Sequence, residues 1–294
     1  MVNLTIRPIE NRDLESCGRI MFQAFKVINE SHGFQNLEVP TLIAGNQIVA
    51  FYVKNPLFSG LVAEQDERIV GFVFIDERSS LVCGIANICV DPAVQSRGVG
   101  RRLMEKALQL HMSLSKKPGA RLVQHSFNTH SFALYSSLGF DLKEPIVLIS
   151  GQFKSQGPVV EIEVRAMKGT DLEECAQLCQ KVLGFDRTNE LKDALRFFNP
   201  YIALRDGHVV SYLSAAKTWP QNHGIAETEE DMKNCLLGIA IPSKAPISFL
   251  VPARQSNFLR WCLEEGLKVI KPMGLMVRGE YQDPNGCYIC SIVY

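Results

Sequence analysis

A weak internal repeat constrains the fold of this chain more than any other feature. Three segments of the first half recur in the second half in the same order, and Arg, Asp, Leu and Glu coincide in the first pair. Matches that keep their order along the chain indicate duplication of one structural unit. The repeat therefore predicts two copies of the same fold. The paired segments are 4–15 with 162–173, 61–72 with 201–212, and 134–140 with 261–267.

Each pair also predicts the same local structure. The first pair reads as a short alternating strand, a polar turn with a capping Asp or Thr, and an amphipathic helix. In the second pair, two apolar stretches flank a polar turn that contains Asp66 or Asp206, as in a β-hairpin. The third pair is a helix that ends at Gly139 or Gly266 and is followed by an apolar strand. Each copy is thus predicted to be an α+β unit.

The length of the chain agrees with two such units. A chain of 294 residues, 46% of them hydrophobic, can bury two cores of ordinary size. Between the copies lies Ser150–Pro158, a stretch rich in glycine and polar residues that is typical of a linker. We therefore predict domains at residues 1–150 and 160–294.

Charge and composition exclude several classes of function. The 31 Lys and Arg residues balance the 31 Asp and Glu residues, so no broad attraction to nucleic acid or anionic lipid is expected. No window approaches the roughly 20 apolar residues of a membrane span, and the first residues do not resemble a signal peptide. The nine cysteines are odd in number and scattered, which predicts buried free thiols and no metal site. These features predict a soluble cytoplasmic protein.

A diphosphate-binding site is predicted between a strand and a helix of the first half. Residues 82–90 form an apolar, β-favouring run that ends at Asp91-Pro92, and apolar residues recur at helical spacing from Val99 onward. Unpaired amides and the dipole at a helix start attract anions, and glycines let phosphate oxygens approach the backbone. The G-x-G-x-x-G spacing of a dinucleotide-binding fold is missing. The candidate segment is Gln95-Ser96-Arg97-Gly98-Val99-Gly100-Arg101.

The pattern Gln95-x-x-Gly98-x-Gly100 after this strand resembles the acetyl-CoA motif of the GNAT superfamily of N-acetyltransferases. The segment from Asn128 to Phe140 resembles the strand and helix that follow in this family. The resemblance covers residues 60–145 with specific motifs and residues 1–60 with weaker ones. It implies two tandem GNAT-like domains of α+β class, each a mixed, mostly antiparallel sheet flanked by helices.

The resemblance also implies how acetyl-CoA is held. In this family the central strand separates from its neighbour after a bulge, and pantetheine lies beside the central strand. A backbone amide of that strand stabilises the oxyanion of the tetrahedral intermediate. No metal takes part. The implied cofactor-binding residues are Ile88, Cys89, Val90, Gln95, Ser96, Arg97, Gly98, Val99, Gly100, Arg101 and Asn128.

Tyr135 is implied as the general acid, because it follows Asn128 at the family spacing and a phenol can protonate the leaving thiolate. Several relatives carry a glutamate base where this chain has Val123. His125 is predicted to face the same side of the strand as Val123 and titrates near neutral pH, so it becomes the candidate base. Two alternatives stay open: His125 is an ordinary polar residue at a strand end, or the amine loses its proton to water.

The acceptor pocket is expected within residues 20–60, where aromatic residues are frequent. The absence of an acidic cluster argues against a polyamine or aminoglycoside acceptor. We predict a small-molecule amine, with a peptide or protein amine as the second choice. The alternative function is a non-catalytic acyl-CoA sensor, which Val123 favours and Tyr135 opposes. The aromatic residues are Phe22, Phe25, Phe34, Phe51, Tyr52 and Phe58.

The second half carries no copy of the phosphate motif. We compare the motif with Leu236–Pro246, which has no matching glycine pattern and contains Pro242 and Pro246. This predicts a degenerate GNAT-like domain without cofactor, and Met273–Glu280 resembles domains of the YitH/HolE type. Docking, walls of the substrate pocket and homodimerisation are the roles left open for it. The run CYICSIVY is predicted to be a strand that fills the last sheet position.

Overall fold

The computed structural model describes residues 4–79, 81–114, 119–155, 157, 161–243 and 245–293. The strands of the first half are β1 (Leu4–Pro8), β2 (Phe58–Gln65), β3 (Arg68–Asp76), β4 (Val82–Val90), β5 (Gly119–His125) and β6 (Asp141–Gly151). Its helices are η1 (Asn11–Asp13), α1 (Leu14–Ser31), α2 (Leu42–Lys54), η2 (Pro92–Val94), α3 (Val99–Leu114) and α4 (Thr129–Ser137).

The second half repeats this order of elements. Its strands are β7 (Glu163–Ala166), β8 (Tyr201–Arg205), β9 (His208–Leu213), β10 (Gly224–Ala226), β11 (Ile247–Pro252), β12 (Lys268–Gly279) and β13 (Cys287–Ile289). Its helices are η3 (Gly169–Asp171), α5 (Leu172–Leu183), α6 (Thr188–Phe197), α7 (Glu229–Ser243) and α8 (Ser256–Glu264). The predicted linker begins inside β6, which includes Ser150 and Gly151. Gln156 and Pro158 of that linker lie outside the described residues.

The first repeated segment has the same side-chain geometry in both halves. Arg7 donates to Asp13 at 2.7 Å, and Arg165 donates to Asp171 at 2.7 Å. Each aspartate also accepts from a backbone amide three residues earlier, which closes the turn before α1 and before α5. Burial alone would raise the pKa of Asp13, but the hydrogen bond from Arg7 and the backbone bond outweigh it and lower that pKa. The repeat read from the sequence is confirmed as a repeated structure.

The other two segments repeat equally well. The hairpins β2–β3 and β8–β9 both carry an irregularity in their register, after Ala63 in the first and after Ala203 in the second. The helices α4 and α8 are followed by Gly139 and Gly266, both with positive φ, a conformation in which glycine ends a helix without strain. Duplication therefore extends from the first strand to the last helix of each unit.

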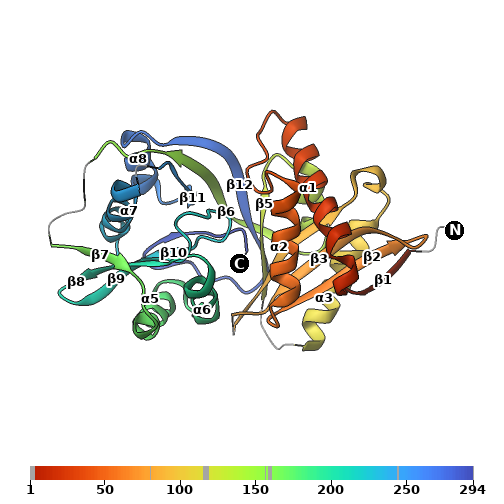
Figure 1. Cartoon of the computed structure of the whole chain (residues 1–294), viewed down its shortest axis with the longest axis horizontal. Helices are drawn as coiled ribbons and strands as arrows, with labels where there is room; N and C mark the ends of the chain where they lie inside the picture. The colour runs from red at the N-terminus through yellow and green to blue at the C-terminus, as the bar shows by residue number, and fades with distance from the viewer. Residues whose placement is uncertain are drawn as a thin grey trace.

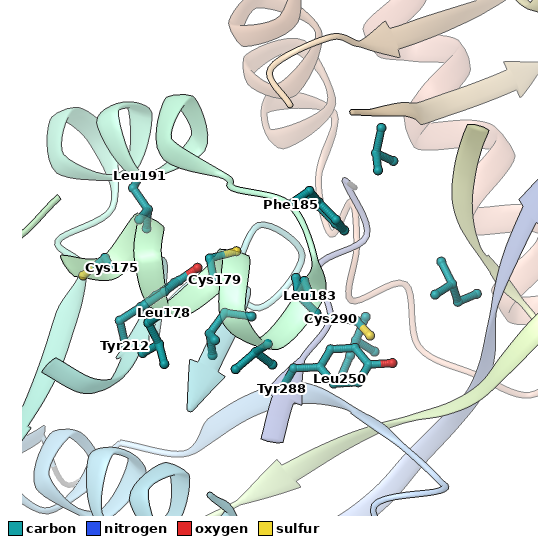
Figure 2. Packing of buried hydrophobic residues seen from close by; sticks show 14 of the residues in the cluster. Cys175, Leu178, Cys179, Leu183, Phe185, Leu191, Tyr212, Leu250, Tyr288 and Cys290 are labelled. Carbon is teal, nitrogen blue, oxygen red and sulfur yellow. The ribbon is translucent and has the colours of Figure 1, made fainter. Parts of the chain in front are cut away.

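Helices cover both faces of each sheet. Along β3, Val73 and Ile75 pack with α3 while Phe72 and Phe74 pack with α1 and α2, as alternation along a strand requires. In the second half α5 and α6 cover one face, where Cys179, Tyr212 and other side chains of the cluster meet (Figure 2), and α7 and α8 cover the other. Nearly all paired strands are antiparallel, and β4 with β5 is the parallel pair among the described residues. The predicted fold class is confirmed.

The two halves exchange their long strands, a feature that the sequence did not predict. The larger sheet has the order β1-β2-β3-β4-β5-β12-β6-β11, so β12 of the second half lies between β5 and β6. Correspondingly, β6 of the first half pairs with β11. These long strands run side by side between the halves (Figure 1), and Leu275, Met276 and Val277 of β12 are completely buried. The exchange brings residues of the second half close to the centre of the first.

The strand predicted near residue 290 is confirmed as β13, but its position is unexpected. It pairs with β10 on one side, and Cys290 just after it bridges to Leu250 of β11 on the other. It therefore fills the gap between the counterparts of β4 and β5. The sheet of this half has the order β13-β10-β9-β8-β7.

The comparison of the phosphate motif with Leu236–Pro246 was wrong. Residues 236–243 lie inside α7, and the counterpart of the loop before α3 is the short connection 227–228 between β10 and α7. The first turn of α7 carries Glu229, Glu230 and Asp231. Acidic residues suit the helix dipole, but they repel the anionic group that a phosphate loop would bind. The prediction that the second half binds no cofactor was therefore argued from the wrong segment when it cited Pro242 and Pro246.

A buried charge cluster joins the halves at their interface. Arg78, which is 8% exposed, contacts Asp76 at 2.6 Å and reaches Asp193 of α6 at 3.2 Å. Glu190 of the same helix lies 3.8 Å away. Burial alone would lower the pKa of Arg78, but the surrounding carboxylates raise it, so the guanidinium stays charged. Removing it would leave Asp76 and Asp193 buried without their cation.

We therefore expect Arg78→Met to lower the free energy of unfolding by about 3–5 kcal/mol, the usual cost of leaving a buried charge unpaired. Arg12→Met is the control, because Arg12 forms an exposed pair with Glu10 and such pairs contribute about 0–1 kcal/mol. Urea denaturation followed by circular dichroism measures both. Equal stability of the two variants would show that the cluster does not hold the halves together.

Candidate functional site

The site is a cavity that opens where β4 and β5 separate. The two strands are paired only from Val82 to Gly84, after which the register of β4 shifts against β3 between Ile85 and Asn87. Beyond that bulge, both strands line a cavity of about 640 Å³. The bulge and the splayed strands implied by the resemblance are thus confirmed. The cavity is also lined by α1, by the loop before α3, by α4, and by two residues of the second half.

The loop at one end of the cavity is built to expose backbone amides. Ser96 and Gly98 adopt positive φ values of 62° and 85°, which turn the chain sharply into α3. The first hydrogen bond of the helix runs from the Arg102 amide to the Gly98 carbonyl, so the preceding amides have no partner within the helix. Together with the helix dipole, these amides form a site for an anion.

Most of the predicted cofactor residues line this cavity, and one does not. Arg97 is exposed and does not belong to the lining. Arg101 lines the cavity and donates to Ser137 at 2.7 Å. The side-chain amide of Gln95 donates to the Val90 carbonyl at 3.0 Å and so connects the loop to the end of β4. The other lining residues from the predicted set are Ile88, Cys89, Val90, Ser96, Gly98, Val99, Gly100 and Asn128.

Asn128 and Tyr135 stand at the two ends of one short helix. The Asn128 side chain accepts from the Ser131 amide at 3.1 Å and caps α4. About two turns later, Tyr135 lines the cavity and is 7% exposed. Burial raises the pKa of its phenol, although a hydrogen bond with Ser131 partly opposes this. At neutral pH the phenol therefore keeps its proton and can donate it.

His125 lies at the end of β5, on the wall of the cavity that faces α1. Its ring stacks on Phe127 at 4.8 Å between centroids and meets the edge of Phe25 at 5.9 Å. Its Nε2 lies 2.9 Å from Oε1 of Glu38, and the side chain is 6% exposed. Val123 packs on the same side of the sheet. The prediction that both residues share one face is confirmed.

Glu38 and Lys271 form a buried pair behind His125 that sequence reasoning missed. Lys271 of β12 is completely buried, and its Nζ lies 2.9 and 3.1 Å from the two carboxylate oxygens of Glu38. The same ammonium donates to Asn29 Oδ1 at 2.7 Å and to the Gln35 carbonyl at 3.0 Å. Burial alone would raise the pKa of Glu38, but His125 and Lys271 outweigh it and lower that pKa. No local pattern links residues 38, 125 and 271, which only the strand exchange brings together.

The acceptor side of the cavity is mainly apolar. Of the six aromatic residues singled out in the sequence, Phe25 lines the cavity, whereas Phe51, Tyr52 and Phe58 pack in the core under α2. Met273 of β12 and Ile292, which follows β13, complete this wall from the second half. Among the described residues that line the cavity there is no Asp or Glu. This composition suits an acceptor with an apolar body.

Three further observations bear on the class of site. All nine cysteines are free and buried, as predicted from their number and spacing. Within the described ranges, no group of three or more His, Cys, Asp and Glu side chains is arranged to hold a metal ion. The described helices include none that combines the length and the apolar character needed to cross a bilayer.

Comparisons with known proteins agree with this geometry. Residues 56–142 match the family model for an acetyltransferase (GNAT) domain. A putative acetyltransferase from Pyrococcus horikoshii is similar in structure, with a TM-score of 0.76 and 16% identity over 97% of this chain and 94% of that one. A tandem GNAT protein from the clavulanic acid biosynthesis pathway has a TM-score of 0.62 and 11% identity, over 96% of this chain and 100% of that one.

A GCN5-related N-acetyltransferase from Sphaerobacter thermophilus is also similar, with a TM-score of 0.61 and 13% identity over 95% of this chain and 96% of that one. No curated protein matches the sequence. Identities this low establish a shared fold only. That fold nevertheless extends over nearly the whole chain, including both halves.

Proposed function

We propose that the first half of this chain, which matches the model of the GNAT acetyltransferase domain over residues 56–142, transfers an acetyl group from acetyl-CoA to the primary amine of a small molecule. The observation that carries the proposal is the cavity between β4 and β5, which ends at the glycine loop of α3. The diphosphate of the cofactor would bind the amides around Gly98 and Gly100. Its pantetheine would lie along Ile88, Cys89 and Val90, where β4 is paired with β3 on one side but not with β5 on the other.

The side chains around this cavity suit acyl transfer. The amine nitrogen attacks the thioester carbon, the carbon–sulfur bond breaks, and the amine loses a proton while the thiolate gains one. Backbone amides of β4 would stabilise the oxyanion. Tyr135 would protonate the thiolate, and His125 would accept the proton of the amine. Both side chains line the same cavity.

The acceptor is proposed from the walls of the cavity. The lining of Phe25, Ile28, Met273 and Ile292, together with the absence of Asp and Glu among the described lining residues, favours an amine on an apolar body. A peptide or protein amine is the second choice. The free buried cysteines support a cytoplasmic location, where thiols stay reduced.

We also propose one cofactor site per chain, within a catalytic domain at residues 1–150. In the partner domain, residues 160–294, β13 fills the space that corresponds to the cavity, and α7 begins with acidic residues. Both features oppose the binding of a CoA diphosphate there. The partner domain instead supplies walls of the first site.

Calorimetry with acetyl-CoA, followed by detection of released CoA thiol with a panel of apolar, cationic and peptide amines, tests the proposal. We expect binding, and turnover that is fastest with apolar amines. Binding without turnover by any amine would indicate an acyl-CoA sensor, the reading that Val123 favours. Absence of binding would overturn the proposed function altogether.

A further inference from the structure

We infer that Glu38 and Lys271 are positioning residues for His125, so that the second half of the chain helps to set the general base of the first. This inference rests on the proposed function. The three side chains form a buried line, in which Lys271 contacts Glu38 and Glu38 contacts His125, at distances of 2.9 Å each. Lys271 comes from β12, and the other two come from the first half.

The hydrogen bond to Glu38 selects the form of the imidazole. A carboxylate can only accept hydrogen bonds, so Nε2 of a neutral His125 carries the ring proton. Nδ1 then holds the free lone pair, and no described residue is in hydrogen-bond contact with it. The ring lines the cavity and is held by Phe25 and Phe127. In other His–carboxylate pairs, a carboxylate orients a histidine base in the same way, through a hydrogen bond to the ring nitrogen that does not react.

Lys271 offsets part of the negative charge that Glu38 places beside His125. The carboxylate of Glu38 attracts positive charge on the imidazole ring. The ammonium of Lys271 offsets that carboxylate, and its three donors are matched by Glu38, Asn29 and the Gln35 carbonyl. The register of β12 shifts between Val269 and Lys271, and this irregularity accompanies the entry of the lysine into the first half.

A purely structural role explains this arrangement poorly. Buried ion pairs contribute little net stability, and apolar side chains of similar size serve a core as well or better. Apolar residues dominate the adjoining cores, whereas this pair lies directly behind a cavity wall. The placement therefore points to a role in setting the properties of His125.

Among the described residues, two charged groups face His125, and their charges are opposite. Glu38 lies in the segment after α1, and Lys271 lies on β12. From α1 the facing residue is Phe25, which is uncharged. The other titratable groups that line the cavity are His32 above Phe127, Cys89 on β4, Arg101 on α3, and His130 and Tyr135 on α4.

Opposite shifts in two variants test the inference. The acidic limb of the kcat/KM profile reports the ionisation of the base in the free enzyme. Glu38→Gln removes the charge that favours the imidazolium, so we expect the midpoint of this limb to fall by about one pH unit. Lys271→Met removes the opposing charge, so the midpoint should rise by about one pH unit. A loss of packing alone would not move the limb in two directions.

The double variant Glu38→Gln/Lys271→Met guards against misfolding, because it removes both buried charges together. Its midpoint should lie between those of the two single variants. Acetyl-CoA binding by all three variants shows that the cavity is intact. If every midpoint coincides with that of the wild type, the inference is wrong while the proposed function stands. If the wild type turns over no amine, both are wrong.

Nuclear magnetic resonance gives a second readout that does not need turnover. A long-range ¹H–¹⁵N spectrum of the wild-type chain distinguishes the two neutral imidazole forms, and His125→Asn assigns the signal among the six histidines. We expect the proton on Nε2. A proton on Nδ1 would contradict the positioning by Glu38.

Discussion

Gly100→Asp is expected to weaken acetyl-CoA binding by roughly a thousandfold, which would abolish it at ordinary concentrations. Gly100 lines the cavity in the first turn of α3, where the proposed diphosphate lies. A carboxylate about 4 Å from a phosphate charge costs about 4 kcal/mol at the effective dielectric of a protein surface. The variant should still fold, because an acidic residue suits the start of a helix. Isothermal titration calorimetry measures the loss.

Two variants at the same position separate bulk from charge. A methyl group at Gly100 would lie 3.6 Å from Leu134 and 3.7 Å from Val90, which are ordinary contacts, so Gly100→Ala should fold normally. Gly100→Asn has the size of aspartate without its charge and should retain more affinity than Gly100→Asp. If all three bind acetyl-CoA like the wild type, the diphosphate lies elsewhere.

Tyr135→Phe should leave acetyl-CoA binding nearly unchanged and lower kcat by about 10²–10⁴-fold, the usual contribution of a general acid. The phenol is buried, and its raised pKa keeps it protonated through neutral pH. Phenylalanine fills the same space but donates no proton to the thiolate. Release of CoA thiol under saturating amine measures the change.

Tyr212→Phe is the matched control, because it removes a buried phenol from the core of the second half. We expect its turnover to equal that of the wild type. A Tyr135→Phe chain that is as active as this control would remove Tyr135 from the acid role. In that case water must protonate the leaving thiolate.

Features encoded within a short stretch of chain could be predicted from the sequence. The strand before Asp91-Pro92, the helix from Val99 and the glycine loop between them depend on neighbouring residues, and all three lie as predicted. The repeat was readable because the bond between Arg7 and Asp13 and its copy in the second half require the same residues at the same spacing.

Features that depend on long-range pairing could not be predicted. Insertion of β12 between β5 and β6 leaves no mark on local periodicity, because a buried strand has the same apolar pattern in either sheet. Consequently nothing in the sequence linked Lys271 of the second half to Glu38 and His125 of the first. The misplaced comparison with Leu236–Pro246 has the same origin, since the short strand β10 gave no clear signal of where α7 begins.

The strand exchange gives the second half a concrete place in the proposed mechanism. Of the roles left open for it, walls of the substrate pocket have direct support in Met273 and Ile292. In the proposed mechanism, only the first unit binds cofactor. In the second unit β13 occupies the corresponding position, and β12 extends into the sheet of the first unit.

The stoichiometry of acetyl-CoA binding to the full chain tests the central claim most directly. Calorimetric titration should give one acetyl-CoA per chain. The heat should disappear in Gly100→Asp and persist in Gly169→Asp, which adds the same charge at an exposed position of the second half where a side chain meets no other atom within 4 Å. Two molecules per chain would contradict a single site in the first half. No binding heat, confirmed by the absence of any protection against thermal unfolding, would contradict the site itself.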